Sequence, residues 1–302
     1  MRALDQAADG RGVFVRTRRI GFDVLRKGHG APARDTTQGH TMIDDPTRRF
    51  TDRVADYVKY RPTYPREVAT FAHVECGVAP GATVADIGAG TGISAKLFLD
   101  AGHPVVAVEP NAAMRAAADQ YLSGYASYRS VAGTAEDTTL ETASVDLVTA
   151  AQAFHWFEKA GARREFARIL KPRGKIVLFW NSRLVKGSAF LEGYEALLRE
   201  FSADYASVAE TYPDDDAMAD WFGDGFEQKT VFPNAQLLDY DGLRGRLASS
   251  SYAPKPGDAR HEPMLAALRD LFDATQRDGR VNFAYETRVY AGRPMAAQRP
   301  NS

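Results

Sequence analysis

The segment from Val84 to Gly92 restricts the fold of this chain more than any other. It begins with a short apolar run that contains one acid, Asp86, and it continues with three glycines at alternate positions, of which Gly88 and Gly90 are the first two. A buried parallel strand requires such an apolar run, and a backbone that turns sharply into a helix beside a ligand requires residues without a Cβ atom. The segment therefore predicts a strand, a turn whose N–H groups face a ligand, and a helix.

The spacing of these glycines differs from the dinucleotide-binding fingerprint. That fingerprint places a third glycine, or an alanine, three residues after the second, where this chain has Ile93. A second apolar run ends at Glu109, about 20 residues beyond the glycines, where a carboxylate accepts hydrogen bonds from both hydroxyls of a ribose. The neighbouring Pro110 and Asn111 also suit the start of a helix, and the two interpretations of Glu109 are compatible.

Length and composition limit the class of protein. The 302 residues are enough for one large α/β domain with an inserted lid, and the net charge of −1 creates no overall field that attracts nucleic acid or an anionic membrane. Cys76 is the only cysteine, so neither an intramolecular disulfide nor a cysteine-based metal cluster is available, and we expect a reducing cytoplasm. No stretch approaches the roughly 20 apolar residues of a membrane-spanning helix.

Apolar runs and helical patterns alternate through the first two thirds of the chain, which predicts a parallel sheet with right-handed crossovers. The pattern predicts strands at 83–87, 104–108, 127–131, 145–150 and 174–180, and helices at 45–60, 65–76, 91–101, 111–122 and 158–170. Beyond Arg183 it predicts helices near 190–201, 240–250 and 261–276, with β-rich stretches near 227–232 and 282–291.

Several separate segments together resemble one enzyme family, the class I S-adenosylmethionine-dependent methyltransferases. Within it the chain is similar to type 11 methyltransferase domains, whose members include trans-aconitate methyltransferase-like proteins. The similarity runs from about Met42 to Asn181 and returns at Tyr290-Ala291-Gly292-Arg293-Pro294. The segments are Phe50-Thr51 through Tyr57 with Tyr60-Arg61-Pro62-Thr63-Tyr64-Pro65, Asp86 to Gly92, Val108-Glu109-Pro110, Gly133-Thr134-Ala135-Glu136-Asp137, Ser144-Val145-Asp146-Leu147-Val148, Ala151-Gln152-Ala153-Phe154-His155-Trp156-Phe157 and Leu170-Lys171-Pro172-Arg173-Gly174.

This resemblance implies an α/β fold with a Rossmann-like, mostly parallel sheet, a C-terminal antiparallel strand pair and an α-helical lid. We expect residues 1–41 to be a disordered extension with Met42 as the natural start, although a basic interaction tail is an alternative. Residues 42–183 are expected to form the cofactor-binding core with N-terminal lid helices. Residues 184–280 are expected to form a mainly helical substrate-side insert with a strand near 227–232, followed by the final strand at 281–294 and a tail at 295–302.

The resemblance implies S-adenosyl-L-methionine as the cofactor and no metal. Backbone groups of the glycine turn would hold its amino acid part, and Glu109 its ribose. Arg61 would pair with the methionyl carboxylate, and an aromatic wall including Tyr57 suits a sulfonium. The expected cofactor-binding residues are Tyr57, Arg61, Asp86, Gly88, Ala89, Gly90, Gly92, Glu109, Pro110, Thr134, Ala135, Glu136 and Gln152.

Alternatives remain open for some of these cofactor-site residues. Asp86 can instead cap nearby backbone amides. Glu136 and Asp137 compete for the contact with adenine, and either can instead belong to a solvated turn.

The acceptor side is expected beyond the fourth strand, where His155 and Trp156 would face the transferable methyl group. Methyl transfer is an in-line displacement for which alignment contributes about 7–11 kcal/mol. His155 would act as the general base for a phenol, an amine or a carbon acceptor, whereas a carboxylate needs no base; a buried structural histidine is the alternative. The expected substrate-binding residues are Tyr64, Trp156, Arg183 and Tyr252, and Arg246 can join Arg183 in orienting an anionic acceptor, although arginines are common at surfaces.

The sequence thus predicts a cytoplasmic methyltransferase that transfers a methyl group to a small-molecule acceptor, on a carboxylate or hydroxyl oxygen, with no nucleic acid or membrane partner. The oligomeric state is left open. Three other functions are alternatives to this prediction. A non-catalytic S-adenosylmethionine sensor would bind without turnover, a nicotinamide-dependent oxidoreductase is disfavoured by Ile93, and a nucleic acid methyltransferase is disfavoured by the neutral charge and by Ala151-Gln152-Ala153-Phe154 in place of an Asn-Pro-Pro-aromatic signature.

Overall fold

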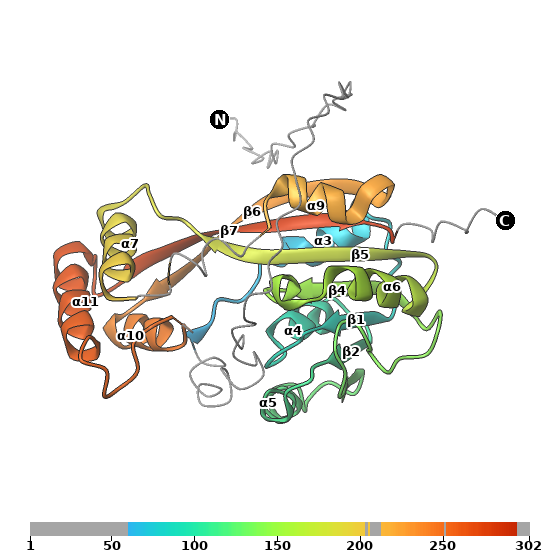
Figure 1. Ribbon diagram of the computed structural model, residues 1–302, viewed down its shortest axis with the longest axis horizontal. Coiled ribbons are helices and arrows are strands. Elements are labelled where there is room, and N and C mark those ends of the chain that lie inside the picture. The colour runs from blue at the N-terminus through green and yellow to red at the C-terminus, as the bar shows by residue number, and fades with distance from the viewer. Residues whose placement is uncertain (1–59, 203–204, 206–212, 251, 295–302) are drawn as a thin grey trace, which may run out of the picture. The chain divides into compact units, whose positions relative to one another are not determined.

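The computed structural model describes residues 60–202, 205, 213–250 and 252–294. Within this part of the chain one seven-stranded sheet has the order β3-β2-β1-β4-β5-β7-β6 (Figure 1). Strands β1 to β5 pair in parallel, and β7 is antiparallel to both β5 and β6. The predicted parallel sheet with a C-terminal antiparallel pair is confirmed. The strands are β1 (Val84–Ile87), β2 (Val105–Val108), β3 (Tyr128–Val131), β4 (Val145–Ala151), β5 (Leu170–Arg183), β6 (Phe226–Leu238) and β7 (Val281–Gly292).

Helices cover both faces of this sheet, as a parallel sheet buried on two sides requires. One face packs against α6 and α9, and the other against α3 and α4. All four residues of β1 and all four of β2 are buried. The helices are α3 (Glu67–Val74), α4 (Ile93–Asp100), α5 (Ala112–Tyr121), α6 (Lys159–Ile169), α7 (Ala189–Phe201), α9 (Asp215–Phe222), α10 (Tyr240–Ala248) and α11 (His261–Thr275), with short 3-10 turns at η1 (Phe154–Trp156) and η2 (Gly223–Gly225).

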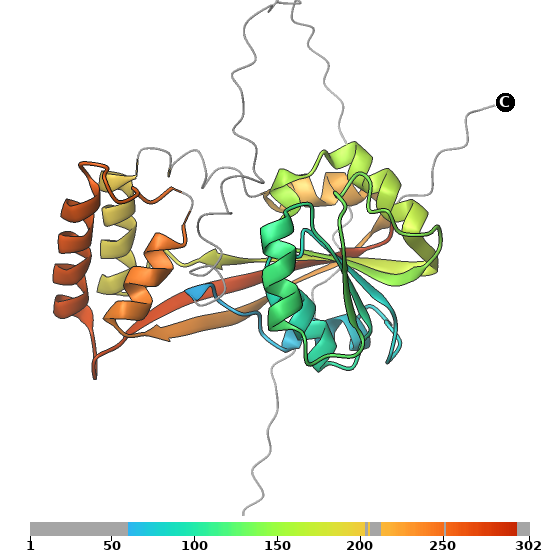
Figure 2. The ribbon, with the colours of Figure 1, turned by 90° about the horizontal axis from the view of Figure 1, so that it is seen from below.

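Strands β5, β6 and β7 are much longer than the first three strands, and α7, α10 and α11 pack at their far end (Figure 2). A separate apolar cluster joins these helices to β7, with Tyr194, Leu247 and Leu268 among its buried residues. Antiparallel pairing with β7 extends the end of β5 as far as Arg183, which lies opposite Tyr285, and parallel pairing of Leu170 with Val145 of β4 extends its start. The strand predicted at 174–180 was too short at both ends, as was the one at 227–232.

The structure does not test two of the predictions, the first helix and the domain boundaries. The helix predicted at 45–60, including Tyr57, lies outside the described residues except for its last residue. The predicted domain boundaries stay predictions. Among the described helices, none combines the length and the apolar character that crossing a bilayer requires.

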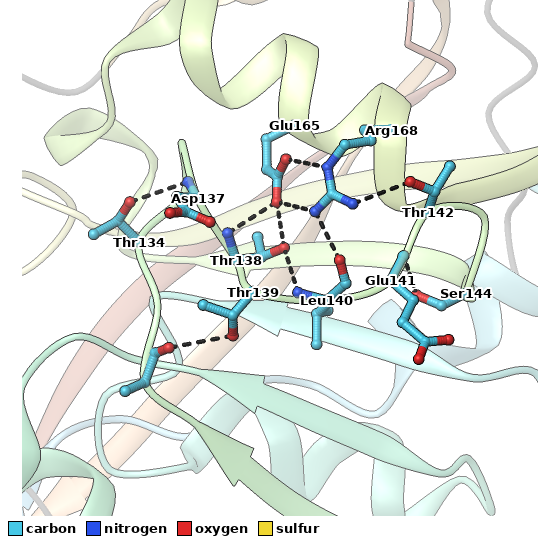
Figure 3. A network of polar contacts seen from close by, with 11 residues as sticks. Thr134, Asp137, Thr138, Thr139, Leu140, Glu141, Thr142, Ser144, Glu165 and Arg168 are labelled. Atoms are coloured by element: carbon cyan, nitrogen blue, oxygen red, sulfur yellow. Dashed lines mark hydrogen bonds and ion pairs between the residues drawn. The ribbon is translucent and has the colours of Figure 1, made fainter.

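A buried carboxylate on α6 fixes the loop that follows β3 (Figure 3). Glu165 is 7% exposed and accepts hydrogen bonds from the backbone N–H of Thr138 at 2.9 Å, from the Thr138 hydroxyl, and from Arg168 at 2.7 Å. Arg168 also donates to the carbonyl of Leu140 at 2.7 Å. Burial acts to raise the pKa of Glu165, but the hydrogen bonds from Arg168 and Thr138 outweigh it and lower the pKa to about 2. The loop is thereby held against α6.

We expect Glu165→Gln to destabilise the fold by about 2–3 kcal/mol at pH 7, because the hydrogen bonds to a charged acceptor are lost. The folded pKa of Glu165 lies below its usual value of 4.5, so its stabilisation is present above pH 4.5 and is lost as the pH falls towards 2. Urea unfolding should show that the difference in free energy of unfolding between the wild type and Glu165→Gln is smaller at pH 4 than at pH 7. The control Glu141→Gln changes an exposed carboxylate of the same loop and should shift stability by less than about 0.5 kcal/mol. Equal stabilities of the Glu165 variant and the wild type would contradict this account.

Candidate functional site

The glycine turn after β1 uses its three glycines in two different ways. Gly88, Gly90 and Gly92 all have positive φ angles, of 67°, 55° and 86°. A Cβ atom on Gly88 would lie 2.6 Å from the side chain of Ala153, and one on Gly92 would lie 2.7 Å from that of Leu122. A Cβ atom on Gly90 would meet nothing within 4 Å. The outer glycines thus allow close packing, whereas the middle one faces open space.

Glu109 connects the end of β2 to this turn. One carboxylate oxygen accepts the backbone N–H of Gly90 at 2.9 Å, and the other accepts that of Asn111 at 2.9 Å. Burial raises the pKa of Glu109, and these two hydrogen bonds oppose the rise. A carboxylate offers about four acceptor positions, so two remain for a ligand. The Asn111 side chain separately caps α5 by accepting from the N–H groups of Ala113 and Met114, as its position predicted.

Asp86 is fully buried and is engaged by the protein itself. Its carboxylate accepts from the hydroxyl of Ser94 at 2.6 Å and from that of Thr149 at 3.0 Å. Burial raises its pKa to about 6 in spite of these hydrogen bonds. Asp86 lines neither of the two cavities described below. The alternative stated from the sequence was a carboxylate that caps nearby backbone amides; in the structure the hydroxyl groups of Ser94 and Thr149 occupy both of its oxygens.

The larger of two adjoining cavities has a volume of about 270 Å³. The sequence predicted seven of its lining residues, namely Gly88, Gly90, Glu109, Pro110, Thr134, Ala135 and Gln152. It did not predict Asn111, Met114 or Phe157 as lining residues. Trp156, expected on the acceptor side, lies here instead. Among the described residues that line it, Glu109 is the one carboxylate, and most of the others are apolar.

The smaller cavity shares Gly88, Gly90, Ala151 and Gln152 with the larger one, so the two meet at the glycine turn. Its volume is about 40 Å³. The predicted residues Arg61, Tyr64, Ala89 and Arg246 line it, together with Pro62, Thr91, Ile93, Ser94, Asn181 and Tyr285.

Two polar groups of the smaller cavity are notable because they are buried. Thr91 is 1% exposed, and its hydroxyl has no hydrogen-bond partner among the described residues. Arg246 is 7% exposed and donates to the hydroxyls of Tyr285 at 3.2 Å and Ser250 at 3.1 Å. Within the described part of the chain, no carboxylate lies within ion-pair distance of Arg246. A buried cation without an acidic partner favours an anionic ligand.

Gln152 stands where the two cavities meet, in a backbone conformation that is rare for residues other than glycine. Its φ angle is 57°, and such a conformation costs of order 1–3 kcal/mol unless the surroundings impose it. Its side-chain oxygen accepts the N–H of Asn181 at 2.9 Å, and its side-chain nitrogen donates to the carbonyl of Asn181 at 3.3 Å. These bonds hold the end of β4 against β5.

Three residues predicted for the site lie elsewhere. Arg183 forms an ion pair with Glu195 and donates to the hydroxyl of Tyr205 at 2.7 Å. Tyr252 packs edge-on against Tyr205, with ring centroids 5.2 Å apart. Glu136 accepts the backbone N–H of Glu158 at 2.7 Å. None of Arg183, Tyr252 and Glu136 lines either cavity, because local hydrogen bonds and ring packing hold these side chains against other parts of the protein.

His155 also lines neither cavity. Burial lowers its pKa to about 4, and the positive charges of Lys159 and Arg61 lower it further in the same direction. The imidazole is therefore neutral near pH 7. Because a general base works best with a pKa near the operating pH, His155 is poorly matched to the role predicted for it.

Some of the cavity residues that were not predicted could have been found from the sequence. Thr91 lies inside the glycine motif, and Asn181 directly follows the apolar run of β5, so their positions in the sequence already indicated a place near the site. Tyr285 carries no local signal, since β7 brings it to the site through pairing with Arg183.

Comparisons with known proteins agree on one family. A sequence model described as a methyltransferase domain matches residues 85–178. An uncharacterized methyltransferase of Schizosaccharomyces pombe is 34% identical over 254 residues, which cover 81% of this chain and 96% of that protein. A second from the same yeast is 28% identical over 263 residues, covering 83% and 97%. A solved structure described as a type II methyltransferase from Anaeromyxobacter dehalogenans has the same fold, with a TM-score of 0.59 and 22% identity over 79% of this chain and 100% of that one.

We expect Glu109→Gln to weaken binding of S-adenosylhomocysteine at least tenfold, because the amide has one acceptor oxygen, so its NH2 group would face the backbone N–H of either Gly90 or Asn111, and because the carboxylate's charge is lost. Isothermal titration calorimetry measures the dissociation constant. The control Glu136→Gln alters an exposed carboxylate outside both cavities and should change binding less than twofold. A larger loss for Glu136→Gln than for Glu109→Gln would overturn this description of the site.

Proposed function

This chain belongs to the class I S-adenosylmethionine-dependent methyltransferases, and we propose that it methylates a carboxylate oxygen of a small anionic acceptor. The observation that carries this proposal is the buried guanidinium of Arg246 at the smaller cavity, which has no acidic partner among the residues that the structure describes. The similarity to trans-aconitate methyltransferases stays a prediction. Family membership rules out the nicotinamide-dependent alternative.

The residues around the two cavities fit the cofactor. When bound, S-adenosylmethionine supplies a methyl group activated by its sulfonium. We assign its nucleoside to the larger cavity, where Glu109 accepts from ribose hydroxyls and Met114 and Phe157 supply apolar surface. We assign its amino acid part to the side of the smaller cavity that the glycine turn forms, where the Thr91 hydroxyl has no other partner among the described residues and the open face of Gly90 lets the ligand approach the backbone. We assign the acceptor carboxylate to the side formed by Arg246 of α10 and Tyr285 of β7.

The protein's own contribution to this transfer is alignment. The hydrogen bonds between Gln152 and Asn181 fix the backbone where the cavities meet, so that an acceptor held beside it keeps one orientation. Such alignment contributes about 7–11 kcal/mol in well-ordered systems. A carboxylate is already deprotonated at neutral pH, and this suits a site whose nearby histidine is a weak base.

Charge favours a small anion over a polymer. Arg246 lies on α10, in the helical part expected to contact the substrate, and its guanidinium attracts and orients an acceptor carboxylate. The net charge of the whole chain is only −1, so there is no broad basic field for nucleic acid. We also propose a cytoplasmic location, in keeping with the single cysteine.

We expect Arg246→Met to raise KM for a carboxylate acceptor at least tenfold and to change KM for S-adenosylmethionine less than about threefold. Acceptors are found by screening small mono-, di- and tricarboxylates beside phenols and amines, and a methyl ester product is recognised by its release in mild alkali. The control Arg244→Met changes an exposed arginine of the same helix and should leave both constants unchanged. Methylation of phenols or amines alone, or an unaltered acceptor KM in Arg246→Met, would contradict the proposal.

We expect His155→Asn to retain kcat within about threefold, because no proton has to be removed from a carboxylate. Since the pKa of His155 is about 4, the wild-type rate should also show no histidine titration between pH 6 and pH 8. Steady-state rates across this range test both points. A loss of 10²-fold or more, as for a general base, would restore His155 to that role.

A further inference from the structure

Residues 60–64 form a short segment, here called the strap, that precedes α3. Arg61, Pro62 and Tyr64 of the strap line the smaller cavity. The strap therefore bounds the cavity that we assign to the amino acid part of the cofactor, and its position affects how that part is enclosed.

Side chains from distant elements hold the strap by its backbone. The carbonyl of Tyr60 accepts from the side-chain amide of Gln236 at 3.2 Å. The carbonyl of Thr63 accepts from two side-chain amides, those of Asn234 at 2.8 Å and Asn181 at 3.2 Å. Asn234 and Gln236 belong to β6, whereas Asn181 belongs to β5. The strap is thus attached to the sheet at both of its ends.

The strap is also attached to α10. Arg61 donates to the carbonyl of Ser249, at the end of this helix, at 3.0 Å. A Cβ atom on Gly245 would lie 2.2 Å from the ring of Tyr60, so the absence of that atom makes room for the ring. These contacts join the strap to the helix that carries Arg246.

All polar groups of Asn181, in its backbone and its side chain, form hydrogen bonds, and their partners belong to four different segments of the chain. Its backbone N–H and carbonyl both bond to the side chain of Gln152, at 2.9 Å and 3.3 Å. Its side-chain oxygen accepts from the hydroxyl of Thr287 at 2.6 Å and from Asn234 at 3.1 Å. Its side-chain nitrogen donates to Thr63. The residue is 7% exposed, so these bonds are shielded from water.

The chemistry of this position requires an amide. The carbonyl of Thr63 can only accept, so the atom of residue 181 that faces it must be a donor. The side-chain oxygen of Asn234 accepts the N–H of Ala235, so its NH2 group is the part that faces Asn181. An NH2 group can only donate, so the other atom of residue 181 that faces it must be an acceptor. An aspartate at 181 would supply two acceptors and no donor, and an apolar residue would supply neither.

We propose that Asn181 is a positioning residue that couples the strap to the turn at Gln152. One arrangement of its groups fixes both the segment beside the cofactor's amino acid part and the strained backbone where the two cavities meet. The cofactor is then enclosed and the methyl-transfer geometry set by the same set of bonds. This inference rests on the proposed function only in assigning the amino acid part of the cofactor to the smaller cavity.

The first test of this coupling is Asn181→Asp, measured by hydrogen exchange of ligand-free protein. The variant removes the donor and places a carboxylate oxygen against the carbonyl of Thr63. We expect the backbone amides of the strap to exchange at least tenfold faster, while the core strands β1 and β2 keep their protection. The control Asn282→Asp adds the same charge at an exposed position of β7 and should leave the strap unchanged. Unchanged strap exchange in Asn181→Asp would overturn the proposal.

A second pair of measurements separates coupling from a simple loosening of the strap. Gln152→Met removes both bonds to the backbone of Asn181 and keeps the bonds from Asn181, Asn234 and Gln236 to the strap. If Asn181 couples the two segments, we expect the strap amides of ligand-free Gln152→Met to exchange at least threefold faster, although no bond of the strap itself has been removed. Asn234→Asp is the matched comparison, because it removes the bonds to Thr63 and to the Asn181 side chain but keeps both bonds between Asn181 and Gln152. Strap exchange in Gln152→Met equal to that of the wild type would refute the coupling to Gln152.

Thr287→Val provides a further variant in case Asn181→Asp does not fold. It removes the hydroxyl that bonds to the Asn181 side chain and keeps the volume and branching of the residue. We expect faster strap exchange here too, because the amide of Asn181 loses one of the groups that orient it. Exchange is measured without cofactor or acceptor, so a wrong acceptor class would show in the activity screen and not in this experiment.

Discussion

The hydrogen bond from Gly90 to Glu109 is the interaction on which the site depends. It joins the turn after β1 to the end of β2, and it thereby fixes the backbone that the two cavities share. The bond is possible because parallel strands bring their carboxyl ends to one edge of the sheet. Glu109 is half-buried, and burial raises the pKa of its carboxyl while the two backbone N–H groups oppose that rise.

The sequence predicted the elements whose residues are close together in the chain. The short strands β1 and β2 are apolar except for Asp86, and a glycine motif or a helix cap follows each of them, so pattern alone located both. The end of β5 was missed because its last residues, Asn181, Ser182 and Arg183, are polar and become a strand by pairing with β7. The contact of Tyr285 with Arg246 has the same origin, since antiparallel pairing joins residues that no local pattern connects. Arg183 shows the converse error. Its position after a strand suggested a ligand contact, but Glu195 on α7 already neutralises it.

Burial has opposite consequences for the two basic groups considered for the acceptor side. His155 can lose its proton, and its burial near other cations therefore makes it neutral. Arg246 cannot, so its burial leaves a charge that hydroxyl groups and the ring of Phe283 contact, with no carboxylate beside it among the described residues. An acceptor that brings its own negative charge and no proton to remove suits both conditions.

The strands β5, β6 and β7 continue without interruption from the nucleotide-binding half of the sheet to the helices α7, α10 and α11. The glycine turn and the helix that carries Arg246 are therefore held by one sheet, although they come from distant segments of the chain. If α10 contacts the acceptor as we propose, substitutions on it change the acceptor that is recognised while the glycine turn keeps its geometry. A lineage with this architecture is free to acquire new substrates without rebuilding the machinery that binds its methyl donor.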